Sequence, residues 1–233
     1  MANHKEAKGE KTQHAYDNLY NLREEKEIAI GKGKLTYVLV DEESKINMNS
    51  ASQNIIERLL QNTSDLSDAA SQKLAESIIA YRSKQPLRVK EELLNIEDFE
   101  EKVFDSCKNS ITIYGNGKVN INTAGTEALK ALGLSDSLAK TIIEFRNGPD
   151  NKEATKDDNF FENTSEVISK LNSFSSLSTE EELLLASLVG NSTIDVKSSS
   201  FTIKADGKIL DNSTMKYEIT LDDKGKIRNW IEY

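Results

Sequence analysis

The sequence predicts an α+β protein, in which a small α/β domain with an antiparallel sheet carries a large inserted all-helical domain. Three observations predict this class. Residues 34–40 alternate as a β-strand does, the chain after Ser200 alternates again, and the long stretch between them shows the apolar spacing of helices. If strands from the two ends pair in one sheet, residues 1–45 and 191–233 form the α/β domain and residues 46–190 the inserted domain.

The N-terminal part of the α/β domain is expected to be a helix followed by a strand. Over residues 13–30 apolar side chains lie weakly on one helical face, although charge dominates. The strand KLTYVLV, residues 34–40, ends in the polar stretch DEESK. Asp41, Glu42 and Glu43 open that stretch, and we interpret them as a turn instead of a metal site.

The inserted domain is expected to contain two copies of one pattern. KINMNSA at residues 45–51 returns as KVNINTA at 118–124, and LAESIIAYR at 74–82 returns as LAKTIIEFR at 138–146. The offsets are 118 − 45 = 73 and 138 − 74 = 64 residues, so the first copy is longer between its two halves. Apolar residues recur at helical spacing in both halves of each copy, which predicts two pairs of helices.

Individual residues of the two copies receive structural roles. Ser50 and Gln53 have the spacing of a capping box that would open the first helix. Arg82 and Arg146 end equivalent helices, where a cation is favourable and can bond the carbonyls of the preceding corner. An alternating asparagine pair precedes each first helix and is expected to cap that helix and tie down the corner between strand and helix. These asparagines are Asn47, Asn49, Asn120 and Asn122.

The remaining elements follow from local patterns. Residues 89–107 predict a helix, and residues 111–122 predict a β-hairpin that turns at Asn116-Gly117. Two further helices are expected at NTSEVISKL and at STEEELLLASLV, the second with a capping box between Ser178 and Glu181. After Ser200 the period of two predicts an antiparallel meander, with turns at Asp206-Gly207 and near Lys224-Gly225.

Each copy has the outline of a helix-hairpin-helix, a motif that usually grips DNA phosphates. A phosphate-binding hairpin needs Gly-apolar-Gly so that backbone N–H groups can approach the phosphate, whereas this chain has Gly133-Leu134-Ser135 in one copy and no hairpin glycine in the other. The chain also carries 39 Asp and Glu against 30 Lys and Arg, a net charge of −9. We therefore expect a structural helix pair and no nucleic-acid partner.

Signals for catalysis are absent from the sequence. His4 and His14 lie in the charged N-terminal segment, and there is no glycine-rich phosphate loop, cysteine pair or nucleophile elbow. The single cysteine, Cys107, is interpreted as a small buried apolar residue. We expect no enzymatic activity and no certain cofactor. Calcium is the one candidate, with Asp150, Asp157 and Asp158 as its ligands, although their irregular spacing favours a solvated acidic loop.

Taken in order, these motifs resemble a known family. The segments that carry the resemblance are, in chain order, the DEESKINMNSA corner, the helix ending IIAYR, PLRVKEELLNI, ITIYGNGKVNINTA, the helix ending IIEFR, FFENTSEVISKL, SSFTIKADGKI and the closing IRNWIEY. Together they are similar to the minor pseudopilin K family of type II secretion, general secretion pathway protein K. The resemblance covers residues from about 33 to 233. It implies a pilin-like α/β domain with an inserted helical domain, in agreement with the architecture above.

The resemblance also implies a function. Members of that family are structural subunits at the pseudopilus tip, where with minor pseudopilins I and J they initiate or cap the filament that exports folded proteins. The implied partners are those subunits and other proteins of the secretion apparatus. The implied location is the periplasm, with an anchor in the inner membrane through an N-terminal hydrophobic helix.

The sequence departs from the family pattern at two places. No hydrophobic helix precedes residues 13–30, and we attribute this to truncation, with residues 13–30 as the stub of the lost helix. The loop with which calcium binding is associated in many relatives is shortened here to SKQP, which weakens a calcium site carried over from the family. Two alternative functions stay open: a soluble helix-hairpin-helix protein that binds DNA, and a minor pilin-like subunit of a type IV pilus.

Overall fold

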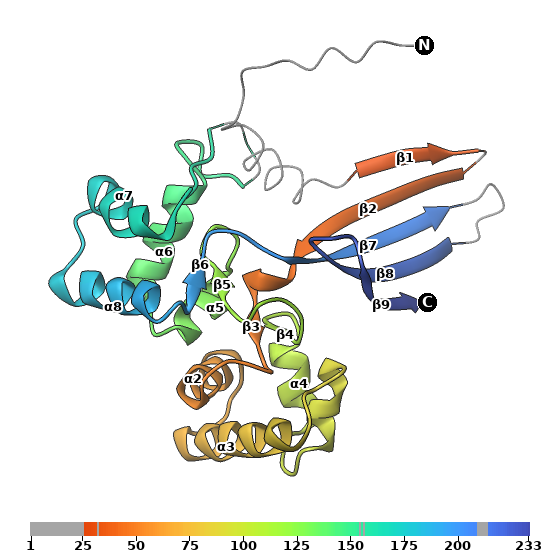
Figure 1. Cartoon of the computed structure of the whole chain (residues 1–233), viewed down its shortest axis with the longest axis horizontal. Coiled ribbons are helices and arrows are strands. Elements are labelled where there is room, and N and C mark those ends of the chain that lie inside the picture. The colour runs from red at the N-terminus through yellow and green to blue at the C-terminus, as the bar shows by residue number, and fades with distance from the viewer. Residues whose placement is uncertain (1–25, 32, 154, 156, 209–213) are drawn as a thin grey trace.

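A five-stranded antiparallel sheet forms one side of the molecule and a helical block forms the other (Figure 1). The computed structural model describes residues 26–31, 33–153, 155, 157–208 and 214–233. The strand order is β1-β2-β7-β8-β9. The bounds are β1 Lys26–Ile30, β2 Gly33–Asp41, β7 Ser200–Lys208, β8 Thr214–Asp222 and β9 Ile227–Glu232.

The central pairing of the sheet joins the two ends of the chain. Strand β2 pairs antiparallel with β7 from Lys34 opposite Lys208 to Asp41 opposite Phe201. The residues between Asp41 and Ser200 are therefore an insertion between two adjacent strands of one sheet. The predicted α+β class, with an antiparallel sheet and a helical insertion, is confirmed. The exact domain bounds at 45/46 and 190/191 stay a prediction.

The insertion consists of two helical units with the same order of elements at their ends. Each unit starts and ends in a two-residue strand, and these two strands pair in parallel with each other. The first unit, residues 46–112, contains β3 Ile46–Asn47, α2 Gln53–Thr63, α3 Asp68–Lys84, η2 Lys90–Asn95, α4 Glu101–Cys107 and β4 Ile111–Thr112. The second unit, residues 119–195, contains β5 Val119–Asn120, α5 Thr126–Ala131, α6 Asp136–Arg146, η3 Thr164–Glu166, α7 Val167–Phe174, α8 Thr179–Gly190 and β6 Ile194–Asp195.

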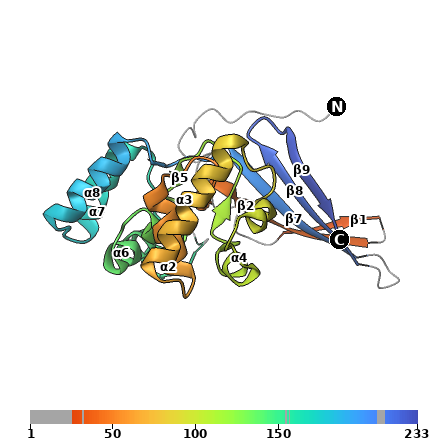
Figure 2. The same cartoon turned by 90° about the horizontal axis from the view of Figure 1, so that it is seen from below.

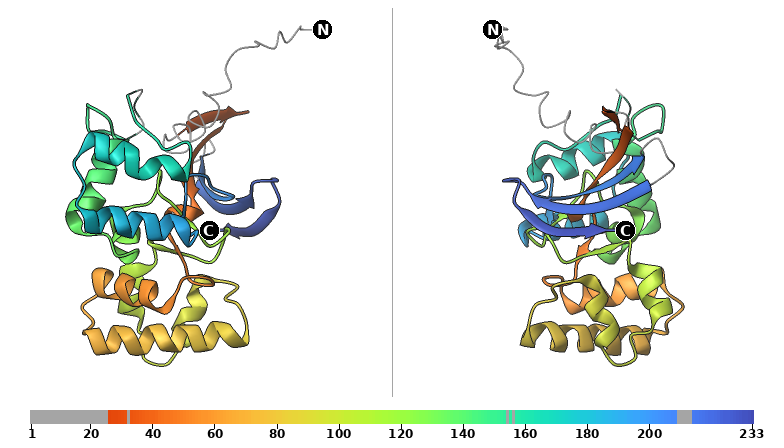
Figure 3. Two further views of the ribbon diagram at one scale, coloured as in Figure 1. Left: turned by 60° about the vertical axis from the view of Figure 1, so that its left-hand side comes forward. Right: turned by 90° about the vertical axis from the view of Figure 1, so that its right-hand side faces the viewer.

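The two units lie one above the other beside the sheet (Figure 3), and in the view from below the helices lie to one side of the five strands (Figure 2). Helix α2 contacts both α3 and α5, so the helix pairs of the two units pack on each other. One continuous cluster of buried apolar residues runs from Ile46 to Val196. It includes most of the predicted apolar stripe: Ile56, Leu59, Leu60, Leu74, Ala75, Ile78, Leu129, Leu132, Leu138, Ala139, Ile142 and Phe145. Burial of these side chains is the main favourable contribution to the stability of the insertion.

The predicted role of Cys107 as a buried apolar residue is confirmed. Its side chain belongs to the core and is fully buried. Burial raises the pKa of the thiol to about 12. Since the thiolate is the reactive form, this cysteine is chemically inert in the folded protein.

Several local predictions are wrong. Residues 26–30 were predicted as helix but form β1, because Ile28 and Ile30 suit a strand and Gly31 turns the chain at φ 57° onto β2. The helix predicted at 89–107 is interrupted at Asp98, which has φ 66°. Residues 1–25, the rest of the predicted N-terminal helix and the site of His4 and His14, lie outside the described residues.

Two predicted turns are also corrected. Asn116-Gly117 does not close a β-hairpin, since β4 and β5 pair with β3 and β6 and not with each other. Asp206-Gly207 lies inside β7, paired on both sides with β2 and β8. The turn near Lys224-Gly225 is confirmed between β8 and β9, with Gly225 at φ 74°.

Of the two predicted capping boxes, one is present and one is not. Ser178 and Glu181 form the predicted capping box of α8. Ser50 does not cap α2: the helix starts later, after Ser52, because the N–H groups of Ser50 and Ala51 both bond to the carbonyl of Asn47 and prolong the corner.

Candidate functional site at the junction of sheet and helices

Three consecutive carboxylates are buried where the sheet passes into the helical units. Asp41 is 6% exposed, Glu42 4% and Glu43 2%. They lie at the end of β2 and in the one-turn 3-10 helix η1 Glu42–Ser44. We call them the acidic junction. The turn predicted here is present as this one-turn helix, but a run of three acidic residues gives no signal that the carboxylates are enclosed.

The Glu43 carboxylate accepts hydrogen bonds from two segments that are distant in the sequence. Its Oε1 accepts from the backbone N–H of Asn116 at 3.3 Å and of Ser199 at 3.1 Å, and from the Ser199 hydroxyl at 2.5 Å. Its Oε2 accepts from the backbone N–H of Ser200 at 3.0 Å. Backbone N–H groups bonded to a charged acceptor replace the water that the carboxylate loses on burial. Glu43 thereby holds the link between the two helical units against the start of β7.

Glu42 extends a chain of hydrogen bonds across the interface. Its Oε1 accepts from Lys45 Nζ and Thr202 Oγ1, both at 2.8 Å, and its Oε2 accepts from Thr112 Oγ1 at 2.5 Å. Thr202 lies 2.9 Å from Thr220 on β8. Burial by itself raises the pKa of Glu42, but the Lys45 charge and these hydrogen bonds outweigh burial and hold the pKa below its ordinary value. Glu42 therefore joins β7 to β4 as a carboxylate.

Asp41 links the end of β2 to the second helical unit by hydrogen bonds. Its Oδ1 accepts from the backbone N–H of Glu43 at 2.9 Å, and its Oδ2 accepts from Ser198 Oγ at 2.6 Å, Asn120 Nδ2 at 3.1 Å and the Thr123 hydroxyl. Burial raises the pKa of Asp41 above its ordinary value, the hydrogen bonds from Ser198 and Thr123 oppose this, and the nearby charge of Glu43 adds to it. The pKa values of Asp41 and Glu42 are thus shifted in opposite directions.

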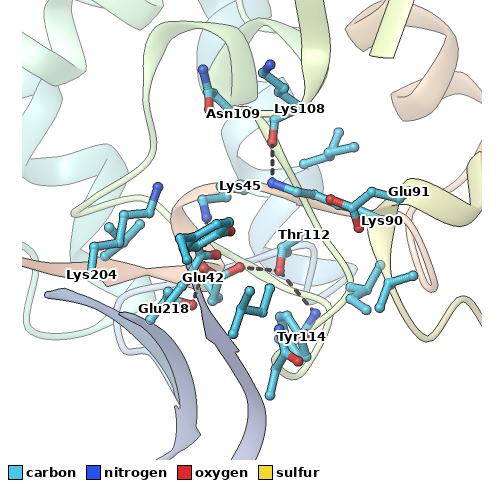
Figure 4. Close-up of a pocket in the computed structure, with 18 residues that line it drawn as sticks. Glu42, Lys45, Lys90, Glu91, Lys108, Asn109, Thr112, Tyr114, Lys204 and Glu218 are labelled. Atoms are coloured by element: carbon cyan, nitrogen blue, oxygen red, sulfur yellow. Dashed lines mark hydrogen bonds and ion pairs between the residues drawn. The ribbon is translucent and has the colours of Figure 1, made fainter. Parts of the chain in front are cut away.

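A cavity of about 340 Å³ lies beside Glu42 (Figure 4). Sheet residues such as Thr202 and Glu218 form one wall, and residues of the first helical unit such as Lys90 and Thr112 form the other. Lys90 Nζ lies 3.4 Å from the carbonyl of Lys108. The described residues that line the cavity include neither histidine nor cysteine.

The repeated asparagines lock the corners of the two units, as predicted. Asn49 donates its side-chain N–H to the carbonyl of Leu87 at 2.9 Å and accepts from the N–H of Leu87 at 2.8 Å. Asn122 makes the same pair of bonds with Phe161, both at 2.8 Å. Their predicted capping role is wrong, because the N-cap positions of α2 and α5 are occupied by Ser52 and Gly125.

The two repeated arginines bond the corner carbonyls, as predicted. Arg82 donates to the carbonyls of Met48 and Ala51, at 2.6 and 2.5 Å. Arg146 donates to the carbonyls of Ile121 and Ala124, at 2.9 and 2.8 Å. These acceptors are equivalent, since 48 + 73 = 121 and 51 + 73 = 124. The sequence repeat is therefore a repeat of hydrogen-bond geometry.

The hairpins present acidic residues where a phosphate would bind. Asp68 and Asp136 occupy the first turns of α3 and α6, the helices that follow the two hairpins. Asp136 lies 2.9 Å from Lys130. A carboxylate at a helix N-terminus already interacts favourably with the N–H groups there and repels a second anion. Each hairpin therefore presents a carboxylate at the helix N-terminus that a DNA phosphate would approach.

The candidate calcium ligands converge on one hydroxyl. Thr155 Oγ1 lies 3.2 Å from Asp150 Oδ1, 2.8 Å from Asp157 Oδ1 and 3.0 Å from Asp158 Oδ1. A hydrogen bond from Thr155, with one from the backbone N–H of Asp150, lowers the pKa of Asp157. Across the described part of the chain, no group of three or more His, Cys, Asp or Glu side chains has the arrangement of a metal site.

Comparisons with known proteins agree with this geometry. A family model for the helix-hairpin-helix motif matches residues 41–112, from Asp41 through the first helical unit. The crystal structure of the GspK-GspI-GspJ complex from the type 2 secretion system of enterotoxigenic Escherichia coli contains a chain of similar fold, with a TM-score of 0.65 and 15% sequence identity, over 90% of this chain and 83% of that chain. No curated protein sequence gives a significant match.

Calcium binding by Asp150, Asp157 and Asp158 stays a prediction. Calcium should raise the thermal unfolding midpoint, because a ligand that binds only the folded state stabilises it. Replacement of Asp157 by Asn should remove that increase, while replacement of Asp206 by Asn, in strand β7, should preserve it. Differential scanning fluorimetry with calcium and with magnesium measures the effect. An unchanged midpoint in calcium would leave the segment as a solvated acidic loop.

Gly115 should be intolerant of a side chain. It has φ 90°, and a Cβ there would lie 2.6 Å from Glu43 Oε1. Gly225 has φ 74° but open space around it, so Gly225→Ala measures the backbone strain alone, about 1–2 kcal/mol. Gly115→Ala should lose at least about 1 kcal/mol more in urea denaturation, because the Glu43 carboxylate must move and leave buried N–H groups unpaired. Equal losses for the two variants would show that Glu43 does not restrain this turn.

Glu42→Gln should reduce stability in a pH-dependent manner. The folded-state pKa of Glu42 is below its ordinary value, so its contribution is present above the unfolded-state pKa and is lost as pH falls through the folded-state pKa. We expect a loss of about 1–3 kcal/mol at pH 7, which shrinks under acidic conditions.

Chemical denaturation of the two proteins at a series of pH values measures this difference. Glu97→Gln, at an exposed position, is the matched control and should change little at any pH. Asp41→Asn should show the opposite trend, because the folded-state pKa of Asp41 is raised, so ionisation of Asp41 reduces stability as pH rises. A constant Glu42→Gln loss across the pH range would mean that the charge of Glu42 does not stabilise the junction.

Proposed function

We propose that this chain is a structural subunit of the minor pseudopilin type, which acts at the tip of a type II secretion pseudopilus and catalyses no reaction. The observation that carries the proposal is the likeness over 90% of the chain to a fold in the GspK-GspI-GspJ complex. The likeness extends through both the sheet and the insertion, so it concerns the whole architecture and not the helix-hairpin-helix motif alone.

The proposed partners are the equivalents of the other two proteins in that complex, minor pseudopilins of the I and J types, together with further proteins of the secretion apparatus. A subunit in a filament has to transmit force without internal rearrangement. The polar links from the acidic junction to Thr112, Thr123, Ser200 and Thr202 tie the helical units to the sheet, and they support such a rigid role. Together with these subunits the chain would initiate or cap the filament.

The proposed location is the periplasm, with an inner-membrane anchor that precedes this sequence. Among the described residues, no helix has the length and apolar composition to cross a membrane. The codons upstream of Asn3 in the gene test the anchor. A short basic leader followed by about twenty apolar codons supports the anchor, and a coding sequence that starts at Met1 contradicts it.

DNA binding is the competing function, because a helix-hairpin-helix model matches residues 41–112. The net charge of −9 and the acidic residues Asp68 and Asp136 at the starts of α3 and α6 oppose it. Phosphate binding draws its affinity from Lys and Arg that displace counterions. A type IV pilus subunit is the other alternative, and the identity of the bound subunits separates it from the proposed function.

Co-purification tests the proposal. When the tagged chain is co-expressed with the I-type and J-type minor pseudopilins of the same genome, we expect all three to elute together in gel filtration. Minor subunits of a type IV pilus from that genome serve as the matched control and should not be retained. Retention of the pilus subunits alone would assign the chain to the pilus.

A second arm addresses DNA. Fluorescence anisotropy of a labelled duplex should not change when the chain is added at physiological salt. Binding that weakens as salt rises, in the absence of a complex with the pseudopilins, would replace the proposed function with DNA recognition.

A further inference from the structure

Among the residues that the structure describes, no strand pairs with the outer side of β9, so this edge of the sheet is open. Strand β9 is the last strand in the order β1-β2-β7-β8-β9. The N–H of Tyr233 donates to the carbonyl of Lys216 at 2.9 Å, and Ile231 lies opposite Glu218. Because backbone groups alternate along an antiparallel ladder, Ile231 and Tyr233 face β8, whereas the N–H and C=O groups of Trp230 and Glu232 face outward.

The open edge also exposes large apolar side chains. Ile227 is 52% exposed, Trp230 53% and Tyr233 70%. The Trp230 ring makes an edge contact with Tyr217, at 5.9 Å between centroids, which fixes it on one face of the sheet. Natural proteins usually protect an edge that combines unpaired backbone groups with apolar side chains, because another strand can pair with it. This edge therefore has the properties of a pairing surface.

We propose that β9 pairs antiparallel with β9 of a second copy of this chain, in a register centred on Trp230. In that register residue i lies opposite residue 460 − i, since 2 × 230 = 460. The two Trp230 residues exchange two backbone hydrogen bonds. Glu232 then lies opposite Arg228 of the second copy (460 − 232 = 228), and Tyr233 lies opposite Ile227 (460 − 233 = 227).

Charge complementarity argues for a second copy as the occupant. The sequence IRNWIEY places a cation and an anion symmetrically about Trp230, so one pairing forms two Arg–Glu contacts and two apolar contacts. Arg228 is already held at the edge by Asp222, at 2.8 Å. The bulge between Thr220 and Leu221 leaves Arg228 without a partner residue in β8, so Arg228 lies at the end of the regular ladder that runs from Asn229 to Glu232.

The resulting dimer would have a continuous ten-stranded sheet. The two-fold axis of an antiparallel self-pairing runs perpendicular to the sheet, so the apolar faces of both copies lie on the same side and the two Trp230 rings become neighbours. The two helical blocks then lie symmetrically about the new strand pair. The inference does not depend on the proposed function, since it rests only on the edge of the sheet.

Charge variants test the register. The wild-type chain should show a concentration-dependent dimer in analytical ultracentrifugation. Glu232→Arg places Arg opposite Arg228 of the second copy, Arg228→Glu places Glu opposite Glu232, and each variant alone should be monomeric. An equimolar mixture of the two should form a dimer again, because every cross-strand pair is then of opposite charge. Circular dichroism checks that each variant is folded.

Cross-linking tests the centre of the register. Directly opposed residues in a hydrogen-bonded pair have Cα atoms about 5.5 Å apart, within the range of a disulfide. Trp230→Cys should therefore give a covalent dimer on mild oxidation. Ile28→Cys, on the exposed opposite edge strand β1, is the matched control and should not. The native Cys107 is buried and does not compete.

A wild-type chain that remains monomeric at its solubility limit overturns the inference. So does a mixture of the charge variants that stays monomeric, or Ile28→Cys that cross-links as readily as Trp230→Cys. None of these outcomes bears on complex formation with other pseudopilins, so failure here is distinguishable from failure of the proposed function.

Discussion

The structure depends on the burial of three adjacent carboxylates at one point of the chain. A buried carboxylate is tolerated only when hydrogen bonds or a cation replace its water, and Asp41, Glu42 and Glu43 each require a different set of donors. Those donors come from β4, the link between the units, β5 and its following corner, and the start of β7. The requirement to satisfy the carboxylates therefore fixes how the two helical units sit against the sheet.

The same principle operates a second time inside each helical unit. The corners carry buried backbone groups with no helix or sheet partner, and Asn49, Asn122, Arg82 and Arg146 supply the missing partners. Apolar packing makes the units stable, but it is not directional. The polar contacts specify which corner faces which helix end. They recur at an offset of 73 residues for the asparagines and 64 for the arginines, which explains why these residue types are repeated in the sequence.

Features with local causes could be predicted from the sequence, and features with distant causes could not. The apolar stripes, the capping box at Ser178 and the alternation of β7 and β8 depend on residues within one turn or one strand. The acidic junction depends on partners such as Thr112, 70 residues from Glu42, and Ser200, 157 residues from Glu43. At Asn116-Gly117 the local hairpin pattern was correct as a turn signal, but Glu43 and the parallel partners of β4 and β5 decide what the turn connects.

The helical units also show why a motif match does not by itself assign a function. In a DNA-binding helix-hairpin-helix the hairpin is left open so that backbone N–H groups meet a phosphate. Here a Cβ on Gly133 would contact the Arg58 guanidinium at 3.0 Å, so that hairpin packs against α2. The hydroxyls of Ser67 and Ser135 accept from the backbone N–H groups of Ala70 and Leu138. One backbone N–H group in the first turn of each of these helices thus already has an internal acceptor, and a shared motif does not by itself establish a shared function.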